Sequence, residues 1–342
     1  MSRSRLTVVL SQAQGKDPRK RALEESLAAA LIMEPGLDVS VIPYLYDLDA
    51  QHTGRLYLES VSGDMVLLGW MYPRAAYWLL DRDGIKGRYG ETQLTPPADD
   101  EDDSEADAPE PPRGIGAVGL PDRYIYCLDL RDFPSHQPYI DEIRRIAEEC
   151  RQRREARQRE QAGAVTMVEL GVKAVNGNGQ APAAAFVPED LLKQPQRRWY
   201  PVIDYSRCTN CMECLDFCLF GVYGVDGQER IVVENQDQCK RGCPACSRVC
   251  PEHAIMFPEY KTPAIAGAPV GAISGLKIDL SKLFGGADAI QIAAQERDRE
   301  LVADGRQAVG LSVGIPKRQA DKPVQPRDDL DTLMDALDAA DL

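Results

Sequence analysis

The sequence predicts an α/β protein, in which residues 1–160 form an open, mostly parallel sheet with helices on its faces. Short apolar runs rich in Val, Ile, Leu and Tyr alternate with helical patterns over these residues. Strands that alternate with helices are typical of a parallel sheet. In addition, 44% of the 342 residues are hydrophobic, an ordinary share for a chain that buries a core.

The elements of this domain follow from the spacing of apolar residues. Strands are expected at residues 6–12, 38–48, 64–71 and 122–130. Helices are expected at residues 19–33, 73–85 and about 137–161. The second helix has Pro73 at its start, where the missing proline N–H removes no helical hydrogen bond.

An acidic stretch interrupts the domain before the last of these strands. Residues 96–112 contain eight carboxylates and no basic residue, so the net charge of −14 becomes −6 without them. A mixture of Pro, Asp and Glu buries too little apolar surface to offset the entropy of ordering. We therefore expect a disordered acidic insertion at about 96–114. The acidic balance also argues against a nucleic-acid partner.

The α/β domain carries no nucleotide-binding motif of the G-x-G-x-x-G or G-x4-G-K-[ST] type. Two groups of residues still allow a ligand. The loop after the first strand is basic, and its charged side chains either bind an anion or are simply solvated. These residues are Lys16, Arg19, Lys20 and Arg21. Four aromatic residues could stack on a flavin, although residues with such spacing more often belong to the core. They are Trp70, Tyr72, Tyr77 and Trp78.

Two regions flank the cysteine-rich part of the chain. Residues 161–199 are rich in Ala, Gly and Pro and predict a linker. Residues 261–342 are too poor in apolar residues for a separate core, so we expect an extended tail with one helix that packs over the rest or over a partner. At its end, 328–341 predicts an amphipathic helix that packs on its own domain or docks on another protein.

Eight of the ten cysteines fall into two runs. The first run has C-x2-C-x2-C-x3-C spacing, with Cys208, Cys211, Cys214 and Cys218. The second has one more residue in its first gap, with Cys239, Cys243, Cys246 and Cys250. The other two, Cys127 and Cys150, stand in apolar or helical contexts and are expected to be buried thiols.

Three kinds of chemistry use clustered cysteines: disulfides, structural zinc and iron–sulfur clusters. Disulfide frameworks suit small secreted chains, whereas this chain is long and shows no secretory signal, so a cytoplasmic location is expected. Zinc prefers two separated C-x2-C pairs. A triplet of thiolates with x2 gaps suits a 4Fe-4S cluster better. No apolar run reaches 18 residues, so no membrane span is expected.

Residues 200–260 resemble a bacterial two-cluster ferredoxin domain, through CTNCMECLDFC and CKRGCPACSRVCP. The resemblance implies an α+β ferredoxin-like fold with two 4Fe-4S clusters and crossed ligands. One cluster would be held by Cys208, Cys211, Cys214 and Cys250. The other would be held by Cys239, Cys243, Cys246 and Cys218. Between the runs, residues 224–238 predict a strand–turn–strand.

Two departures from the ferredoxin pattern are visible. The first is the extra residue in CKRGC, which Gly242 can absorb because glycine tolerates unusual backbone angles. The second is Leu219, which stands where proline usually follows the fourth cysteine, whereas Pro251 keeps it. Three residues close to the runs, Lys240, Arg241 and His253, are expected either to favour the reduced state of a cluster or to be solvated charges.

These observations favour an electron carrier or electron-transfer subunit over a stand-alone enzyme. Its partner would be a redox protein or a multi-subunit oxidoreductase. The three histidines, His52, His136 and His253, stand in no recognisable catalytic setting. Two alternatives remain: an oxidoreductase whose α/β domain binds a flavin, nucleotide or substrate served by the clusters, and a structural or redox-sensing iron–sulfur protein.

Overall fold

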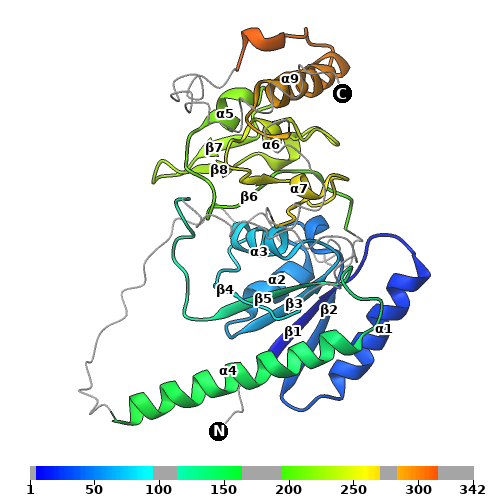
Figure 1. The fold of residues 1–342 in the computed structure, drawn as a ribbon, viewed down its shortest axis with the longest axis vertical. Helices are drawn as coiled ribbons and strands as arrows, with labels where there is room; N and C mark the ends of the chain where they lie inside the picture. Colours follow the sequence, from blue (N-terminus) through cyan, green and yellow to red (C-terminus); the bar gives the residue numbers. More distant parts are fainter. Residues whose placement is uncertain (1–4, 95–113, 164–194, 270–282, 315–342) are drawn as a thin grey trace, which may run out of the picture.

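The computed structural model describes residues 5–94, 114–163, 195–269 and 283–314. The predicted acidic insertion except Gly114, most of the predicted linker, and the predicted terminal helix at 328–341 lie outside the described residues. The described chain forms two stacked units, an α/β unit and a unit that contains the cysteine runs (Figure 1). The domain boundaries themselves stay a prediction.

The first unit contains a five-stranded parallel sheet, which confirms the predicted α/β class. Its strand order is β2-β1-β3-β5-β4, and every pair is parallel. In chain order the strands are β1 (Leu6–Ser11), β2 (Leu37–Ile42), β3 (Met65–Gly69), β4 (Arg88–Gly90) and β5 (Tyr124–Asp129). The helices are α1 (Pro18–Ile32), α2 (Thr53–Ser60), α3 (Pro73–Arg82) and α4 (Gln137–Gly163).

Helices cover both faces of this sheet because successive strand residues point to opposite sides. On one face, Val8 and Leu10 of β1 pack in one core cluster with Leu27 of α1 and Ile143 of α4. On the other face, Val9 packs in a second cluster with residues of α2 and α3. Residues of the cysteine-bearing unit join this second cluster, so α3 lies between the sheet and that unit (Figure 1).

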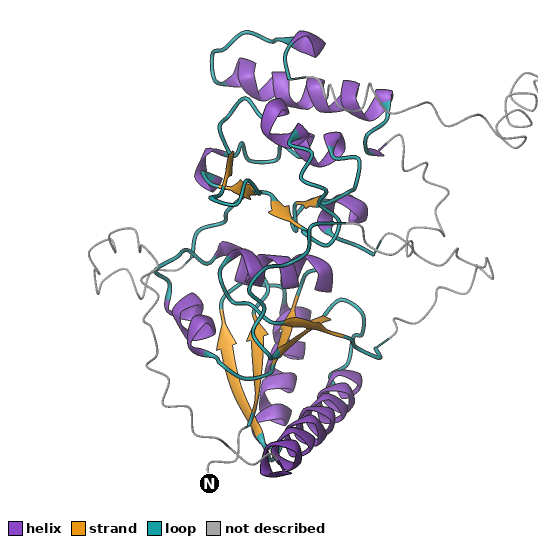
Figure 2. Cartoon of the chain, turned by 90° about the vertical axis from the view of Figure 1, so that its left-hand side faces the viewer, coloured by secondary structure: helices purple, strands orange, loops and turns teal. Residues whose placement is uncertain are grey.

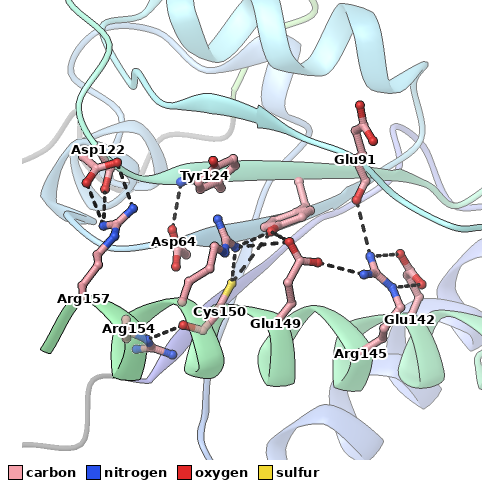
Figure 3. Close-up of polar contacts among 12 residues, drawn as sticks. Asp64, Glu91, Asp122, Tyr124, Glu142, Arg145, Glu149, Cys150, Arg154 and Arg157 are labelled. Carbon is pink, nitrogen blue, oxygen red and sulfur yellow. Dashed lines mark hydrogen bonds and ion pairs between the residues drawn. The ribbon is translucent and has the colours of Figure 1, made fainter. Parts of the chain in front are cut away.

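Helix α4 is held by charged contacts on its exposed side. Arg145 lies 2.8 Å from Glu149 within the helix, and Arg157 lies 2.8 Å from Asp122, just before β5 (Figure 3). Exposed pairs of this kind contribute only about 0.2–1 kcal/mol each. The burial of Ile143 and of its apolar neighbours on α4 therefore accounts for most of its docking.

The second unit consists of short elements. Two antiparallel pairs, β6 with β9 and β7 with β8, lie beyond the carboxyl edge of the large sheet (Figure 2). The strands are β6 (Val202–Ile203), β7 (Tyr223–Val225), β8 (Ile231–Val233) and β9 (Ile255–Met256). The helices are α5 (Glu213–Phe217), α6 (Ala245–Val249), α7 (Pro263–Ala266) and α9 (Ala287–Ala303), and the 3-10 turns are η3 (Gln236–Gln238) and η5 (Gly310–Ser312). A further 3-10 turn, η1 (Leu45–Asp47), belongs to the first unit. The β7–β8 pair confirms the predicted strand–turn–strand.

The two units share a buried polar interface. The Tyr46 hydroxyl donates to the carbonyl of Tyr200 at 2.5 Å and accepts from its N–H at 2.7 Å, and the two rings lie 4.4 Å apart. Arg74 of α3 contacts Asp204 at 2.5 Å and the carbonyl of His253 at 2.6 Å. Because these buried polar groups pair with one another across the two units, the interface fixes how the units meet.

Several sequence expectations for the first unit were wrong in detail. The strand predicted at 38–48 ends at Ile42, because Pro43 cannot donate to a strand ladder and the chain then forms η1. Helix α2 and strand β4 were not predicted. Strand β4 is only three residues long, and its RYG sequence gives no apolar run.

Within the described residues, no helix is long and apolar enough to cross a membrane.

Candidate metal centre

The first cysteine run begins with a loop in left-handed backbone conformations. Asn210 and Met212 have φ of 59° and 65°, values that are uncommon outside glycine. The Asn210 side chain stabilises this loop, since it donates to the carbonyl of Glu229 and accepts from the N–H of Ile231, both at 2.8 Å. The loop is thereby attached to β8.

The two runs repeat the same local structure after their loops. Cys214 lies in α5 and Cys246 in α6, and each five-residue helix ends at the fourth cysteine of its run, Cys218 or Cys250. The third and fourth cysteines of a run are therefore separated by one helical turn. Cys218 and Cys250 are extended C-cap residues, so the chain turns away from the helix at the fourth cysteine of each run.

Gly242 has the conformation expected for the extra residue of the second run. Its φ is +86°, and a Cβ added at this position would meet no atom within 4 Å. The N–H of Cys243 donates to the carbonyl of Lys240 at 3.0 Å, which closes a tight turn. The prediction for Gly242 is confirmed, because the left-handed region is open to glycine at little cost.

The eight cysteines line two separate pockets of similar size, each with a cavity volume of about 20 Å³. The pocket that we name the first cysteine pocket is lined by Cys208, Cys211, Cys214 and Cys250. The second cysteine pocket is lined by Cys218, Cys239, Cys243 and Cys246. Each pocket thus takes three cysteines from one run and the last cysteine of the other run.

The donor chemistry of these pockets fits an iron–sulfur cluster. None of the eight cysteines forms a disulfide bond, and thiolate sulfur is the usual ligand of such clusters. Among the described residues, no three His, Cys, Asp or Glu side chains converge on a point where a single metal ion would be held. The sulfurs are instead spaced around a pocket. The assignment of individual cysteines as ligands stays a prediction.

Burial raises the pKa of seven of these thiols. The pKa of Cys243 and that of Cys250 rise to about 12, with desolvation as the largest cause for both. Metal binding requires thiolates, so loading the pockets with metal displaces protons. One further polar group is present, since the buried Tyr223 hydroxyl donates to Cys246 Sγ at 3.0 Å.

The two pockets differ in charge. The first cysteine pocket is lined by Glu213 and Glu252. The second is lined by Lys240 and Arg297. Positive charge stabilises the more negative, reduced state of a redox centre, and carboxylates oppose it. On this charge difference, a redox centre in the second pocket would be easier to reduce than one in the first.

Arg297 is a site residue that the sequence reasoning missed. It is 1% exposed, and it donates to the carbonyls of Val313 and Gly310 at 2.9 and 2.6 Å. Its guanidinium lies 4.5 Å from the Phe217 ring centroid. A signal was present in α9, because Arg297 occupies one position in a stripe of small and apolar residues spaced by four, namely Ala289, Ala293 and Leu301. Helix α9, which lies within the predicted tail, packs over α6.

Residues 114–116, which follow the predicted insertion, also contact the site. The N–H of Ile115 donates to the carbonyl of Cys208 at 2.8 Å, and the N–H of Gly114 to that of Ser206 at 2.7 Å. A Cβ on Gly114 would lie 2.3 Å from the Ser206 backbone. Glycine is therefore required at this close approach.

The charged residues predicted near the runs differ in their surroundings. Lys240 pairs with Asp304 at 2.6 Å and lines the second cysteine pocket, whereas Arg241 is exposed. The His253 ring lies 4.2 Å from that of Phe284. Burial, followed by the nearby Arg207 and Arg74, lowers the pKa of His253 to about 4, so this imidazole is neutral near pH 7.

The candidate ligand residues of the α/β unit are largely used within the fold. Glu24 accepts hydrogen bonds from the Ala13 N–H and the Trp70 indole, and it pairs with Arg21 at 2.9 Å. Lys20 lies 4.6 Å above the Trp70 ring. Within the aromatic group, Tyr77 and Trp78 belong to the core, and Trp70 and Tyr72 pack against it. Lys16 and Arg19 are exposed. The two thiols outside the runs, Cys127 and Cys150, are buried as predicted.

Comparison with known proteins shows a similarity to a ferredoxin. Over 79 residues, the chain is 42% identical to an uncharacterized ferredoxin of Methanocaldococcus jannaschii. The match includes 23% of this chain and 53% of that protein, so the chain spans about half the length of the curated relative it matches. No family model matches, and no solved structure matches. The similarity supports a ferredoxin-like iron–sulfur domain.

Proposed function

We propose that the chain is a ferredoxin-type electron-transfer protein that relays single electrons through two 4Fe-4S clusters to or from a protein redox partner. The observation that carries this proposal is the pair of pockets, each lined by four cysteines that form no disulfide bond. A bound cluster supplies one-electron redox chemistry, with a potential that depends on charge, hydrogen bonds and burial.

The cysteines of each pocket are the proposed ligands. One cluster is assigned to Cys208, Cys211, Cys214 and Cys250, and the other to Cys239, Cys243, Cys246 and Cys218. The surrounding chain excludes water from both, since five of these eight cysteines are buried. Tyr223 and the charged residues that line each pocket then give the two clusters different reduction potentials.

The remaining parts of the chain are proposed to select the partner. This partner is a redox protein or a multi-subunit oxidoreductase, and the predicted helix at 328–341 is a candidate docking element. We also propose a cytoplasmic location, because free thiols persist in reducing compartments.

The test is an iron and sulfide count on anaerobically purified full-length protein, followed by a reductive titration monitored by EPR. About eight irons with two reversibly reducible signals are expected for two 4Fe-4S clusters. About four irons would contradict the two-cluster proposal. Zinc, or iron that resists reduction, would contradict the electron-transfer function.

Single cysteine variants test the crossed ligation. In C250S, the signal assigned to the first cysteine pocket is expected to change, although Cys250 belongs to the second run. In C218S, the second pocket is expected to be affected. C127S is the matched control, because Cys127 is buried in the core of the α/β unit, and it should leave both signals unchanged. If each variant instead affects the pocket of its own run, the crossed assignment is wrong.

A further inference from the structure

The outer surface of the second unit contains a groove between α9 and the segment that follows it. The groove has a volume of about 550 Å³, and all its lining residues belong to α9 or to residues 308–311. Both segments lie at the end of the second unit that is far from the large sheet (Figure 1). We name this feature the α9 groove.

The lining of the α9 groove is largely apolar. Three of its residues, Ala294, Ala308 and Gly310, have little or no side chain, so another helix can approach the backbone closely there. Val302 and Leu311 also line the groove, and these two residues are 58% and 46% exposed. Apolar residues that gather around a groove are typical of a surface that binds another apolar segment.

Hydrogen bonds hold the two walls of the α9 groove together. Asp298 of α9 accepts the N–H groups of Val309 and Gly310 at 3.0 and 2.5 Å. Arg297 donates to the carbonyls of Gly310 and Val313 at 2.6 and 2.9 Å. The segment after α9 is thus fixed along the helix by two neighbouring side chains, so the groove is a built feature of the fold.

The charged residues that line the α9 groove have opposite signs. The Asp298 carboxylate is already bonded to the backbone of the opposite wall. Arg299 pairs with Glu300 at 3.2 Å, and its side chain is 67% exposed. The groove therefore selects its occupant through apolar contact and not through charge.

A segment of this chain has a matching apolar pattern. Residues 328–341 lie outside the described residues, and their sequence predicts an amphipathic helix. The apolar face of this helix has the spacing i, i+3, i+4 and i+7, which is that of helices that bind in apolar grooves. Its residues are Leu330, Leu333, Met334 and Leu337.

The connection between the groove and this segment is short. Leu311 lies in the groove wall, and the described residues continue only to Gly314. The 15 residues of 315–329 then lead to Leu330. Fifteen residues reach up to about 50 Å, about twice the ~26 Å length of α9. A segment tethered within such reach has an effective concentration of about 1 mM at the groove, which favours it over an occupant from another molecule.

We propose that residues 328–341 bind as a helix in the α9 groove of their own chain, with the four apolar residues of the segment against the groove lining. This inference does not depend on the proposed electron-transfer function, because it concerns contacts within the chain. Since α9 packs over α6, the bound segment adds a further layer over the second cysteine run. A partner that binds the same apolar face has to displace the segment from the groove.

The experiment follows amide hydrogen exchange of residues 328–341 in the full-length protein by mass spectrometry. The test variant is V302D/L311D, which places two carboxylates in the groove at exposed positions. The matched control is V225D/I292D. It makes the same change in net charge at two apolar residues that are 46% and 40% exposed and do not line the groove.

We expect the amides of 328–341 to exchange about 10-fold more slowly in the unmodified protein than in V302D/L311D. Protection of this size follows if the segment binds with a Kd of about 0.1 mM at an effective concentration of about 1 mM. The control should keep the protection within about twofold. The protection should also stay constant over a roughly 50-fold range of protein concentration, because binding within one chain does not depend on it.

A second variant, L333D/M334D, tests the same contact from the side of the segment and leaves the groove unchanged. It should accelerate exchange at residues 308–312, where the N–H groups of Val309 and Gly310 bond to Asp298. This measurement decides the matter if V302D/L311D does not fold. Unchanged exchange at 308–312 would contradict the inference.

Three other results would overturn the inference. Unprotected amides at 328–341 in the unmodified protein would mean that the segment does not bind to the chain. Protection that persists in V302D/L311D would mean that the segment binds elsewhere. Protection that increases with protein concentration would mean that it enters the groove of a second copy. None of these results depends on bound iron, so a failure here is distinguishable from a failure of the proposed function.

Discussion

The loss of the Arg297 charge is expected to lower the reduction potential of the cluster proposed for the second cysteine pocket. Arg297 lines that pocket from α9 and is almost completely buried. Its positive charge stabilises the reduced state, which is one unit more negative than the oxidised state. R297M keeps much of the side-chain volume and removes the charge, so the potential becomes more negative.

The magnitude follows from Coulomb's law. A unit charge about 8 Å away contributes about 2 kcal/mol at an effective dielectric constant of about 20. Asp298 lies 3.1 Å from Arg297 and offsets part of this effect, which leaves about 1 kcal/mol as the expected net contribution. For a one-electron couple this corresponds to a decrease of about 40 mV.

The assay is an EPR-monitored redox titration in which the two clusters are followed separately. The first cysteine pocket serves as an internal reference, because Glu213 and Glu252 line it and Arg297 does not. R297K keeps the charge and should leave both potentials nearly unchanged. R299M removes a charge from the same helix at a side chain that is 67% exposed, and it should have little effect.

Two outcomes would refute this reasoning. If R297M and R299M shift the potential equally, the local position of the charge is irrelevant. If R297K lowers the potential as much as R297M does, the hydrogen bonds of the guanidinium to the backbone matter and its charge does not. A shift of the first pocket alone would contradict the assignment of Arg297 to the second.

Three further predictions concern the fold around the site. His52 accepts the N–H of Gly54, the second residue of α2, through its neutral ring, and burial lowers its pKa below 6.5. The cap therefore contributes about 1 kcal/mol to the free energy of unfolding above pH 6.5, and this contribution is lost as the pH falls through the lowered pKa of His52. H52N should remove this pH dependence, which thermal unfolding at pH 7 and 5.5 would measure. An identical pH response of the two proteins would contradict the cap. G114V should reduce the iron content, because its Cβ collides with Ser206, and unchanged iron would show that the contact is dispensable. Y46F should destabilise the protein by about 2 kcal/mol, since it leaves buried backbone groups of Tyr200 unpaired, whereas a change in melting temperature below 2 °C would refute that role.

Local sequence patterns were sufficient for most of the α/β unit. Strands β1, β3 and β5 and helices α1, α3 and α4 were predicted, because their apolar periodicity agrees with their burial. Helix α2 was missed for a physical reason. Its eight residues bury only Gly54 and Leu58, so no clear apolar stripe marks it.

Only part of the candidate site could likewise be predicted from local sequence patterns. The spacing within each cysteine run is a local property, and the sequence was enough to group the eight residues. Arg297 and Gly114 lie 47 residues after Cys250 and 94 residues before Cys208. Only tertiary folding brings them to the pockets, and no spacing rule along the chain encodes such contacts.

The long separation between Cys250 and Arg297 also has a consequence during synthesis of the chain. A ribosome that adds about 5–20 residues per second needs roughly 2–9 s to proceed from the last cysteine to this arginine. During that interval all eight cysteines have been made, while α9, which packs over α6, is incomplete. The second cysteine pocket consequently passes through an open stage in which metal and sulfide can enter, and the later arrival of α9 closes it.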